Sequence, residues 1–174
     1  LNNHYIICGY GRIGRVLCRH LKIADIDVAV IEKDPEQITV MDEDGILYIA
    51  GEATDENILL KVGIKRAQGL VAALATDTDN VFLVLTARQL EPESFIMGRS
   101  SKETAKIKLR AACANSVESP YEMGAVSMAH RIIRPTVNSF LDLAYAYKRK
   151  DIQMEEIPVS SASELVNIQL KESG

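Results

Sequence analysis

The sequence predicts an α/β fold, a doubly wound parallel sheet of six strands with helices on both faces. Short apolar runs alternate along the chain with segments whose apolar residues recur at helical spacing. A glycine-rich turn directly follows the first apolar run. The chain has 174 residues, 47% of them apolar, which is enough for one such domain and a short additional segment.

Six short apolar runs are expected to form the strands. They are rich in Ile, Val and Leu, as strands buried on both faces usually are. A helical pattern fills each interval between them, which favours parallel pairing through crossover connections. In chain order the expected strands span residues 4–8, 27–32, 46–50, 70–74, 95–97 and 116–118.

Caps and periodicity indicate where the helices begin. Asp34 is an expected N-cap, with Pro35 at the first helical position. Ser100 followed by Glu103 fits a capping box for a later helix. The helix over residues 78–90 is expected to turn four apolar side chains toward the core, namely those of Val81, Phe82, Val84 and Leu85.

The expected strands and helices divide the chain into one complete domain and a remainder. The sixth strand and the helix after it are complete by residue 135, so the domain is expected over residues 1–135. A further helix is expected over residues 136–150, and residues 151–174 are too few for a substrate domain. Because the chain begins at Leu1 rather than Met, we expect it to be part of a longer protein.

The glycine-rich turn fits the G-x-G-x-x-G motif of Rossmann-type dinucleotide-binding folds. It follows a strand and opens an amphipathic helix, which is the context that the motif requires. Gly9 permits the tight turn, Gly11 lets the backbone approach a pyrophosphate, and Gly14 permits close helix–strand packing. The alternative is a glycine turn needed only for packing. The motif residues are Gly9, Tyr10, Gly11, Arg12, Ile13 and Gly14.

Glu32 closes the second expected strand, where Rossmann sites place an acid that accepts hydrogen bonds from ribose hydroxyls. A ribose 2′-phosphate at this place would meet like charge. NAD or a simple adenine nucleotide is therefore favoured over NADP. Lys33 is a neighbouring cation that could screen such a phosphate. A solvated carboxylate at a strand end is the alternative interpretation of Glu32.

Polar residues also follow the next three strands, on the rim where open α/β sheets bind ligands. Plain helix capping is an equally good interpretation of Thr76 and Asp77. Arg99 is expected to pair either with a phosphate or with an acidic loop. The additional candidates are Glu52 and Ala53 after the third strand, Thr76, Asp77 and Asn80 after the fourth, and Arg99 after the fifth.

Composition and charge exclude several classes of function. A general nucleic-acid binder usually carries a basic patch, and the net charge here is −4. Cys8, Cys18 and Cys113 lack metal-ligand spacing and are expected to be buried thiols in a reducing cytosol. The chain contains no run of about 18 apolar residues, so we expect no membrane span within it.

Catalytic groups are scarce. His4 starts the first strand, His20 falls on the apolar face of the first helix, and His130 lies in a late helix. No Tyr is followed four residues later by Lys, as in short-chain dehydrogenases. We therefore expect no enzyme. An NAD-dependent oxidoreductase and an assembly module with a vestigial nucleotide site are the alternatives.

Taken in order, these motifs resemble the RCK domain, the regulator of potassium conductance, which also forms the cytosolic subunits of Trk- and Ktr-type potassium uptake systems. The third-strand loop has Glu52 where the family usually has Asp. The resemblance covers about residues 4–145. The segments that carry it are residues 4–14, 30–35, 51–54, 60–64 and 75–80, with Ser119-Pro120 and Gly124.

The resemblance implies a cytoplasmic regulatory domain at the inner face of a membrane protein. It would bind NAD or NADH, with ATP or ADP as the alternative, and gate a potassium channel pore or transporter. It implies a homodimer or a larger ring, a crossover helix over residues 136–150 and the start of a C-terminal subdomain over 151–174. The net charge of −4, and not the resemblance, argues against a nucleic-acid partner. No metal site is expected, because calcium-gated relatives carry carboxylates where this chain has Ala73 or Ala75, Gly98 and Ser100.

Overall fold

The computed structural model describes residues 1–133 of the chain. Residues 1–125 form one compact unit. The expected helix over residues 136–150 and the expected segment over residues 151–174 lie outside the described residues.

A six-stranded parallel sheet forms the centre of the domain, which confirms the predicted fold class. Its strand order is β3-β2-β1-β4-β5-β6, so the chain reverses its winding direction between β1 and β4. Open α/β sheets bind ligands beside the carboxyl ends of their strands at this kind of switch point. The strands are β1 (Tyr5–Cys8), β2 (Val28–Glu32), β3 (Tyr48–Ala50), β4 (Gly69–Ala72), β5 (Phe95–Arg99) and β6 (Ser116–Glu118).

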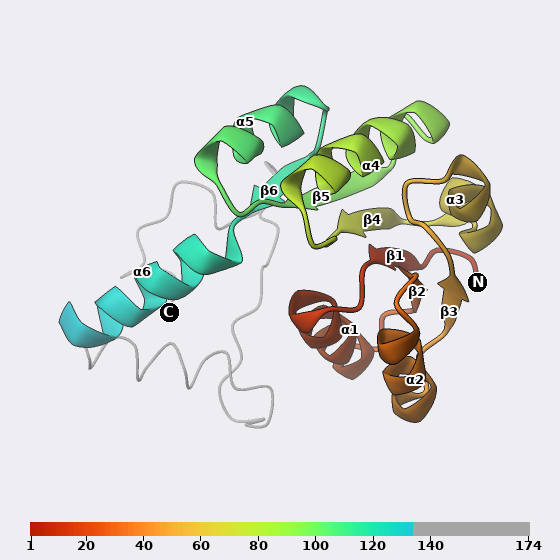
Figure 1. Ribbon diagram of the computed structural model, residues 1–174, viewed down its shortest axis with the longest axis horizontal. Helices are drawn as coiled ribbons and strands as arrows, with labels where there is room; N and C mark the ends of the chain where they lie inside the picture. The colour runs from red at the N-terminus through yellow and green to blue at the C-terminus, as the bar shows by residue number, and fades with distance from the viewer. Residues whose placement is uncertain (134–174) are drawn as a thin grey trace, which may run out of the picture. The chain divides into compact units, whose positions relative to one another are not determined.

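Helices cover both faces of this sheet. Helices α1 and α2 lie on one face, and α3, α4 and α5 lie on the other (Figure 1). Helix α6 follows β6. The helices are α1 (Arg12–Ile23), α2 (Pro35–Asp44), α3 (Glu56–Val62), α4 (Asp77–Leu90), α5 (Glu103–Ala111) and α6 (Pro120–Ile133), with a short 3-10 helix at Ile64–Arg66.

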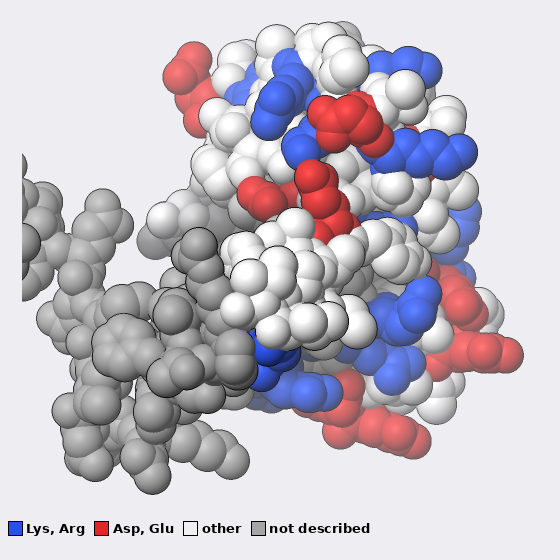
Figure 2. Space-filling view, turned by 90° about the vertical axis from the view of Figure 1, so that its left-hand side faces the viewer, with Lys and Arg blue, Asp and Glu red and all other residues white. Residues whose placement is uncertain are grey.

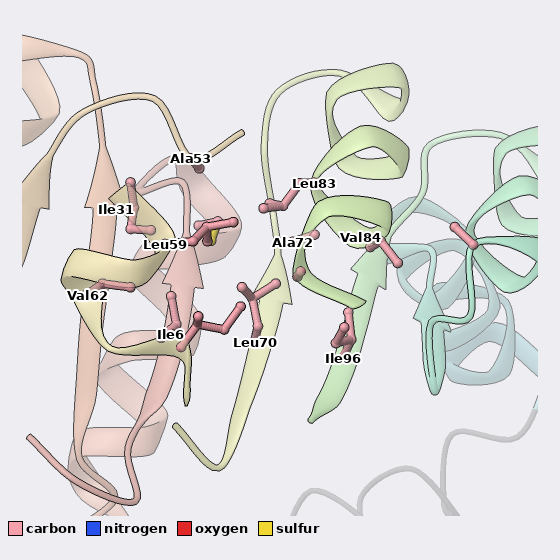
Figure 3. Close-up of a cluster of buried hydrophobic side chains, with 14 of the residues drawn as sticks. Ile6, Ile31, Ala53, Leu59, Val62, Leu70, Ala72, Leu83, Val84 and Ile96 are labelled. Atoms are coloured by element: carbon pink, nitrogen blue, oxygen red, sulfur yellow. The ribbon is translucent and has the colours of Figure 1, made fainter. Parts of the chain in front are cut away.

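Two apolar clusters, one on each face, hold the layers together. Successive strand residues point to opposite faces, so Ile6 packs under α3 and α4 while Ile7 packs under α1 and α2. Figure 3 shows the first cluster, in which Leu59 of α3 and Leu83 of α4 face the sheet residues. The near-continuous burial of β1, β2 and β4 explains why these strands are apolar runs without alternation.

Local signals fix two helix ends, the first of them as predicted. The Asp34 carboxylate accepts a hydrogen bond from the amide of Glu36 at 3.0 Å, with Pro35 in the first helical position. Gly63 ends α3 with a φ of 88°, a left-handed conformation that glycine adopts without strain.

Other expectations about side chains are wrong. Phe82 and Leu85 are 57% and 51% exposed, because α4 packs on the sheet through Leu83, Val84 and Ala87 instead. His20 is also exposed on α1 rather than buried. Of the four residues predicted to face inward on α4, Val81 and Val84 do pack in the core, so apolar spacing identified only part of the buried face.

Two polar expectations fail for local reasons. Ser100 forms no capping box with Glu103, because it is buried and its hydroxyl contacts the carbonyl of Glu118 while Lys102 takes the N-cap position. Cys113 is exposed, in a left-handed turn with a φ of 65° after α5, whereas Cys8 and Cys18 are buried as expected.

Candidate functional site

A cavity of about 700 Å³ opens beside the carboxyl ends of β1 to β5. Its walls come from the glycine turn, from the ends of β2 and β3, and from the loop after β4. The structure thus brings together residues that are far apart in the sequence. The predicted residues that line it are Gly9, Gly11, Arg12, Ile13, Glu32, Lys33, Glu52, Ala53 and Arg99.

The three glycines of the turn have different roles. Gly9 has a φ of 100°, and a Cβ placed on it would lie 2.8 Å from the carbonyl oxygen of Ala73. A Cβ on Gly14 would overlap the carbonyl oxygen of Gly9, so this glycine lets α1 pack against the turn. A Cβ on Gly11 would meet nothing within 4 Å. Gly11 therefore keeps a surface of the cavity open instead of permitting packing.

Helix α1 begins beside Gly11 and presents an uncapped amino end to the cavity. Gly11 is its N-cap and supplies no side-chain hydrogen bond, and its first turn contains no acidic residue. Arg12 and Ile13 of this turn line the cavity. Amide groups and the positive end of the helix dipole are suited to bind phosphate oxygens here.

Tyr10 anchors the turn and does not line the cavity. Tyr10 is 2% exposed. Its backbone amide donates a hydrogen bond to the carboxylate of Glu32, and its hydroxyl donates one to the carboxylate of Asp44 at 2.9 Å. The guanidinium of Arg15 lies 5.9 Å from the centre of the ring. Burial raises the pKa of Tyr10 and the hydrogen bond to Asp44 does likewise, so the hydroxyl remains a donor.

Glu32 joins the end of β2 to the glycine turn. Its carboxylate accepts hydrogen bonds from the amides of Tyr10 at 2.6 Å, Lys33 at 2.8 Å and Asp34 at 3.0 Å. These amides fix the carboxylate at the cavity wall in one orientation. Each carboxylate oxygen has two lone pairs, so the fixed group retains capacity to accept a ribose hydroxyl.

Lys33 and Glu52 form an ion pair that the sequence reasoning missed. Their Nζ and Oε2 atoms are 2.7 Å apart, and their side chains are 66% and 44% exposed. Parallel pairing of Glu32 with Ala50 brings the ends of β2 and β3 to one edge. The pairing of these two strands could have predicted the contact, because residues that follow neighbouring parallel strands meet at the same edge of the sheet.

The predicted polar residues after β4 hold the fold instead of lining the cavity. Thr76 caps α4 by accepting from the amide of Asp79 at 3.1 Å, which confirms the capping interpretation. Asp77 accepts from the amide and the hydroxyl of Ser101 at 2.8 and 2.7 Å. Asn80 is fully buried. None of the three is among the residues that line the cavity.

Asn80 and Arg99 together tie the loop after β4 to β5. The Asn80 amide group bonds both the amide and the carbonyl of Leu74, at 2.8 and 3.2 Å, and the carbonyl of Arg99 at 3.0 Å. Arg99 lies within β5 and lines the cavity, but its Nη1 donates to the Leu74 carbonyl at 2.7 Å. This contact is with a backbone carbonyl and not with an acidic loop, and the pairing of Arg99 with a phosphate stays a prediction.

Several lining residues were not predicted at all. Asp34, Gln37 and Asp79 come from the starts of α2 and α4, and Pro120 and Tyr121 begin α6. All five come after the carboxyl end of a strand, so the predicted sheet order contained the signal that could have found them.

Basic and acidic side chains are mixed on the surface of the domain. On the face that Figure 2 draws, Lys and Arg are interspersed with Asp and Glu. Within residues 1–133, no group of three or more His, Cys, Asp or Glu side chains is placed to hold a metal ion. No helix in this part of the chain combines the length and the apolar character needed to cross a membrane.

Comparison with known proteins agrees with this geometry. The model of the TrkA-N domain family matches residues 5–120. The chain belongs to the TrkA-N domain family. A probable potassium channel protein of Methanocaldococcus jannaschii is 37% identical over 182 residues, which cover 99% of this chain and 52% of that protein. The chain thus spans about half the length of this relative.

Solved structures of the GsuK channel have the same fold. The GsuK channel bound to NAD matches with a TM-score of 0.63 and 29% identity, covering 69% of this chain and 22% of that one. GsuK bound to ADP matches with a TM-score of 0.67 and 27% identity, covering 74% and 33%. The resemblance to RCK domains is therefore confirmed.

Proposed function

We propose that this domain binds a nucleotide, with NAD or NADH favoured, and uses the binding energy to regulate a potassium channel or transporter. The pyrophosphate would lie against the amides of residues 11–13, and a ribose would lie against Glu32. The observation that carries the proposal is the open surface at Gly11 beside the fixed carboxylate of Glu32 in one cavity. An uncapped helix end and a ribose acceptor are the two groups that a dinucleotide site needs.

The comparisons support a regulatory role over a catalytic one. The M. jannaschii relative is a probable potassium channel, and GsuK is a channel found with NAD and with ADP. Among the described histidines, His4 is buried and its Nε2 contacts the Val62 carbonyl at 3.1 Å, outside the residues that line the cavity. We therefore propose a sensor without catalytic activity, on the cytoplasmic side of a membrane protein.

Gating requires that the nucleotide bind two arrangements of the protein with unequal affinity, since equal affinity shifts no equilibrium. We propose that the two arrangements differ in how two copies of the domain are oriented within a homodimer or ring. Scattering profiles of the assembled protein with and without nucleotide should then differ. Identical profiles at saturation would contradict this part of the proposal.

The binding proposal is tested by titration calorimetry of the purified chain with NAD, NADH, ATP and ADP. We expect saturable binding of NAD or NADH. In a Gly11→Asp variant a carboxylate would face the pyrophosphate, so binding should be lost while the fold is kept, because the side chain enters open space.

Gly124→Asp is the matched control, since this glycine lies on α6, outside the residues that line the cavity, and also has open space around it. Its affinity for the nucleotide should equal that of the wild type. Preference for ATP or ADP would make the domain an energy sensor. Unchanged affinity in Gly11→Asp would contradict the proposed site.

A further inference from the structure

The ion pair between Lys33 and Glu52 lies at the wall of the cavity beside the ribose acceptor. Lys33 directly follows Glu32, and its Nζ lies 2.7 Å from Oε2 of Glu52. All three residues line the cavity. A ligand whose ribose contacts Glu32 would therefore meet this pair at its 2′ position or close to it.

The charge of Lys33 is already balanced. The hydrogen bond to Glu52 raises the pKa of Lys33, and the negative charges of Glu52, Asp79 and Glu32 act in the same direction. Asp34 and Asp79 add two further carboxylates to the cavity wall. At this end of the cavity the lysine is thus a paired cation among acids.

A ribose with a free 2′-hydroxyl and a ribose with a 2′-phosphate make opposite demands on such a site. The hydroxyl needs an acceptor, which Glu32 supplies. The phosphate needs a cation, and Lys33 is adjacent in sequence to Glu32. To serve a phosphate, Lys33 would have to leave Glu52, and the phosphate would then lie beside two uncompensated carboxylates.

We propose that Glu52 sets the cofactor class of this site by holding Lys33, so that nucleotides with a free ribose 2′-hydroxyl bind and 2′-phosphorylated nucleotides are rejected. This inference rests on the proposed function, because it concerns the same cavity. It makes Glu52 a specificity-determining residue and Lys33 a latent phosphate ligand.

Four proteins test the inference, each the full 174-residue chain. They are the wild type, Glu52→Gln, the double variant Lys33→Gln with Glu52→Gln, and Glu93→Gln as the matched control. Glu93 is exposed and does not line the cavity, so its substitution makes the same change of charge elsewhere. The probes are NAD against NADP, and AMP against adenosine 2′,5′-bisphosphate, measured by titration calorimetry.

Glu52→Gln should tighten the binding of NADP and of the bisphosphate by about tenfold, because it removes one negative charge and releases Lys33. NAD and AMP lack the 2′-phosphate, so the ratio of the NADP affinity to the NAD affinity, and that of the bisphosphate to AMP, should rise in the same proportion. The double variant should lose the gain, and Glu93→Gln should behave as the wild type. The gain should shrink as salt is added, because Lys33 and Glu52 are exposed.

Two results overturn the inference while leaving the proposed function intact. In the first, NAD binds normally but Glu52→Gln leaves the ratio of the NADP and NAD affinities unchanged. In the second, the gain persists in the double variant, so that Lys33 is not its source. A wild-type chain that binds neither NAD nor AMP overturns the proposed function and this inference with it.

Discussion

The two halves of the sheet use their polar residues in different ways. At the ends of β1, β2 and β3, most of the residues predicted to bind a ligand line the cavity, as Glu32 and Glu52 do, whereas Tyr10 and Gly14 do not. At the end of β4, Thr76, Asp77 and Asn80 are used in hydrogen bonds within the fold. The comparison teaches that a position on the ligand-binding rim is not sufficient for a binding role.

The difference arises from how the backbone groups that follow the strands obtain their hydrogen-bond partners in each half. The first half has the glycine turn, whose backbone supplies an amide to Glu32 and leaves the amino end of α1 without a side-chain cap. The second half has no such turn after β4, and the backbone groups of Leu74 are instead satisfied by side chains of Asn80 and Arg99. Buried backbone groups require partners, so these side chains have a structural task first.

The largest effect is expected from glycine substitutions in the first half. Gly14→Ala should lower the free energy of unfolding by about 3 kcal/mol, because its Cβ would overlap the carbonyl of Gly9. Gly11→Ala should change that free energy by no more than about 1 kcal/mol and should weaken nucleotide binding. Urea denaturation and calorimetry check the pair. Equal losses of stability in both variants would contradict the separate roles given to these glycines.

Substitutions in the second half should lower the stability of the fold without abolishing nucleotide binding. Asn80→Ala leaves backbone groups of Leu74 and Arg99 without their partner and should cost about 2–3 kcal/mol. The nucleotide should still raise the Tm of this variant. Asn57→Ala, at an exposed position of α3, is the control and should change stability by less than about 0.5 kcal/mol. An Asn80→Ala protein that folds with wild-type stability would remove the distinction between the halves.

A smaller effect is expected from His4, which precedes β1 at its amino end. Burial lowers the pKa of His4 below its ordinary value of 6.5, so the folded state favours the neutral ring. The stability that His4 contributes is full above pH 6.5 and is lost as the pH falls from there through the lowered pKa. The loss should not exceed about 1.4 kcal/mol per pH unit.

Urea denaturation between roughly pH 7.5 and roughly pH 5.5, a range above the titration of most carboxylates, checks this dependence. In His4→Gln the decline over this range should be reduced. A decline of equal steepness in the variant would assign it to other groups. Nucleotide affinity corrected for unfolding should not follow the same curve, since His4 does not line the cavity.

The sequence predicted the parallel sheet, its strands and the glycine turn, because these depend on local patterns. The apolar run of β1 and the spacing of Gly9, Gly11 and Gly14 are short-range signals with one physical interpretation. The predicted inward face of α4 was correct for Val81 and Val84, which pack in the core, and wrong for Phe82 and Leu85, which lie on the solvent side. Which face of a helix meets the sheet depends on tertiary packing.

The parts of the candidate site in which side chains from different strands meet were harder to predict from the sequence. Glu32 was recognised by its place after a strand, but its bonds to the amides of Tyr10, Lys33 and Asp34 require coordinates. The pairing of Lys33 with Glu52 joins residues 19 positions apart. A polar residue's choice between a ligand and a backbone partner, as at Asn80, is decided by what else needs a hydrogen bond nearby.

The central claim is that the nucleotide occupies the first half of the rim. A crystal structure of the chain saturated with NAD tests it most directly. We predict pyrophosphate oxygens at the amides of residues 11–13 and a ribose hydroxyl within hydrogen-bond distance of the Glu32 carboxylate. NAD bound elsewhere, for example in the groove between α4 and α5 that Phe82 and Lys108 line, would contradict the account.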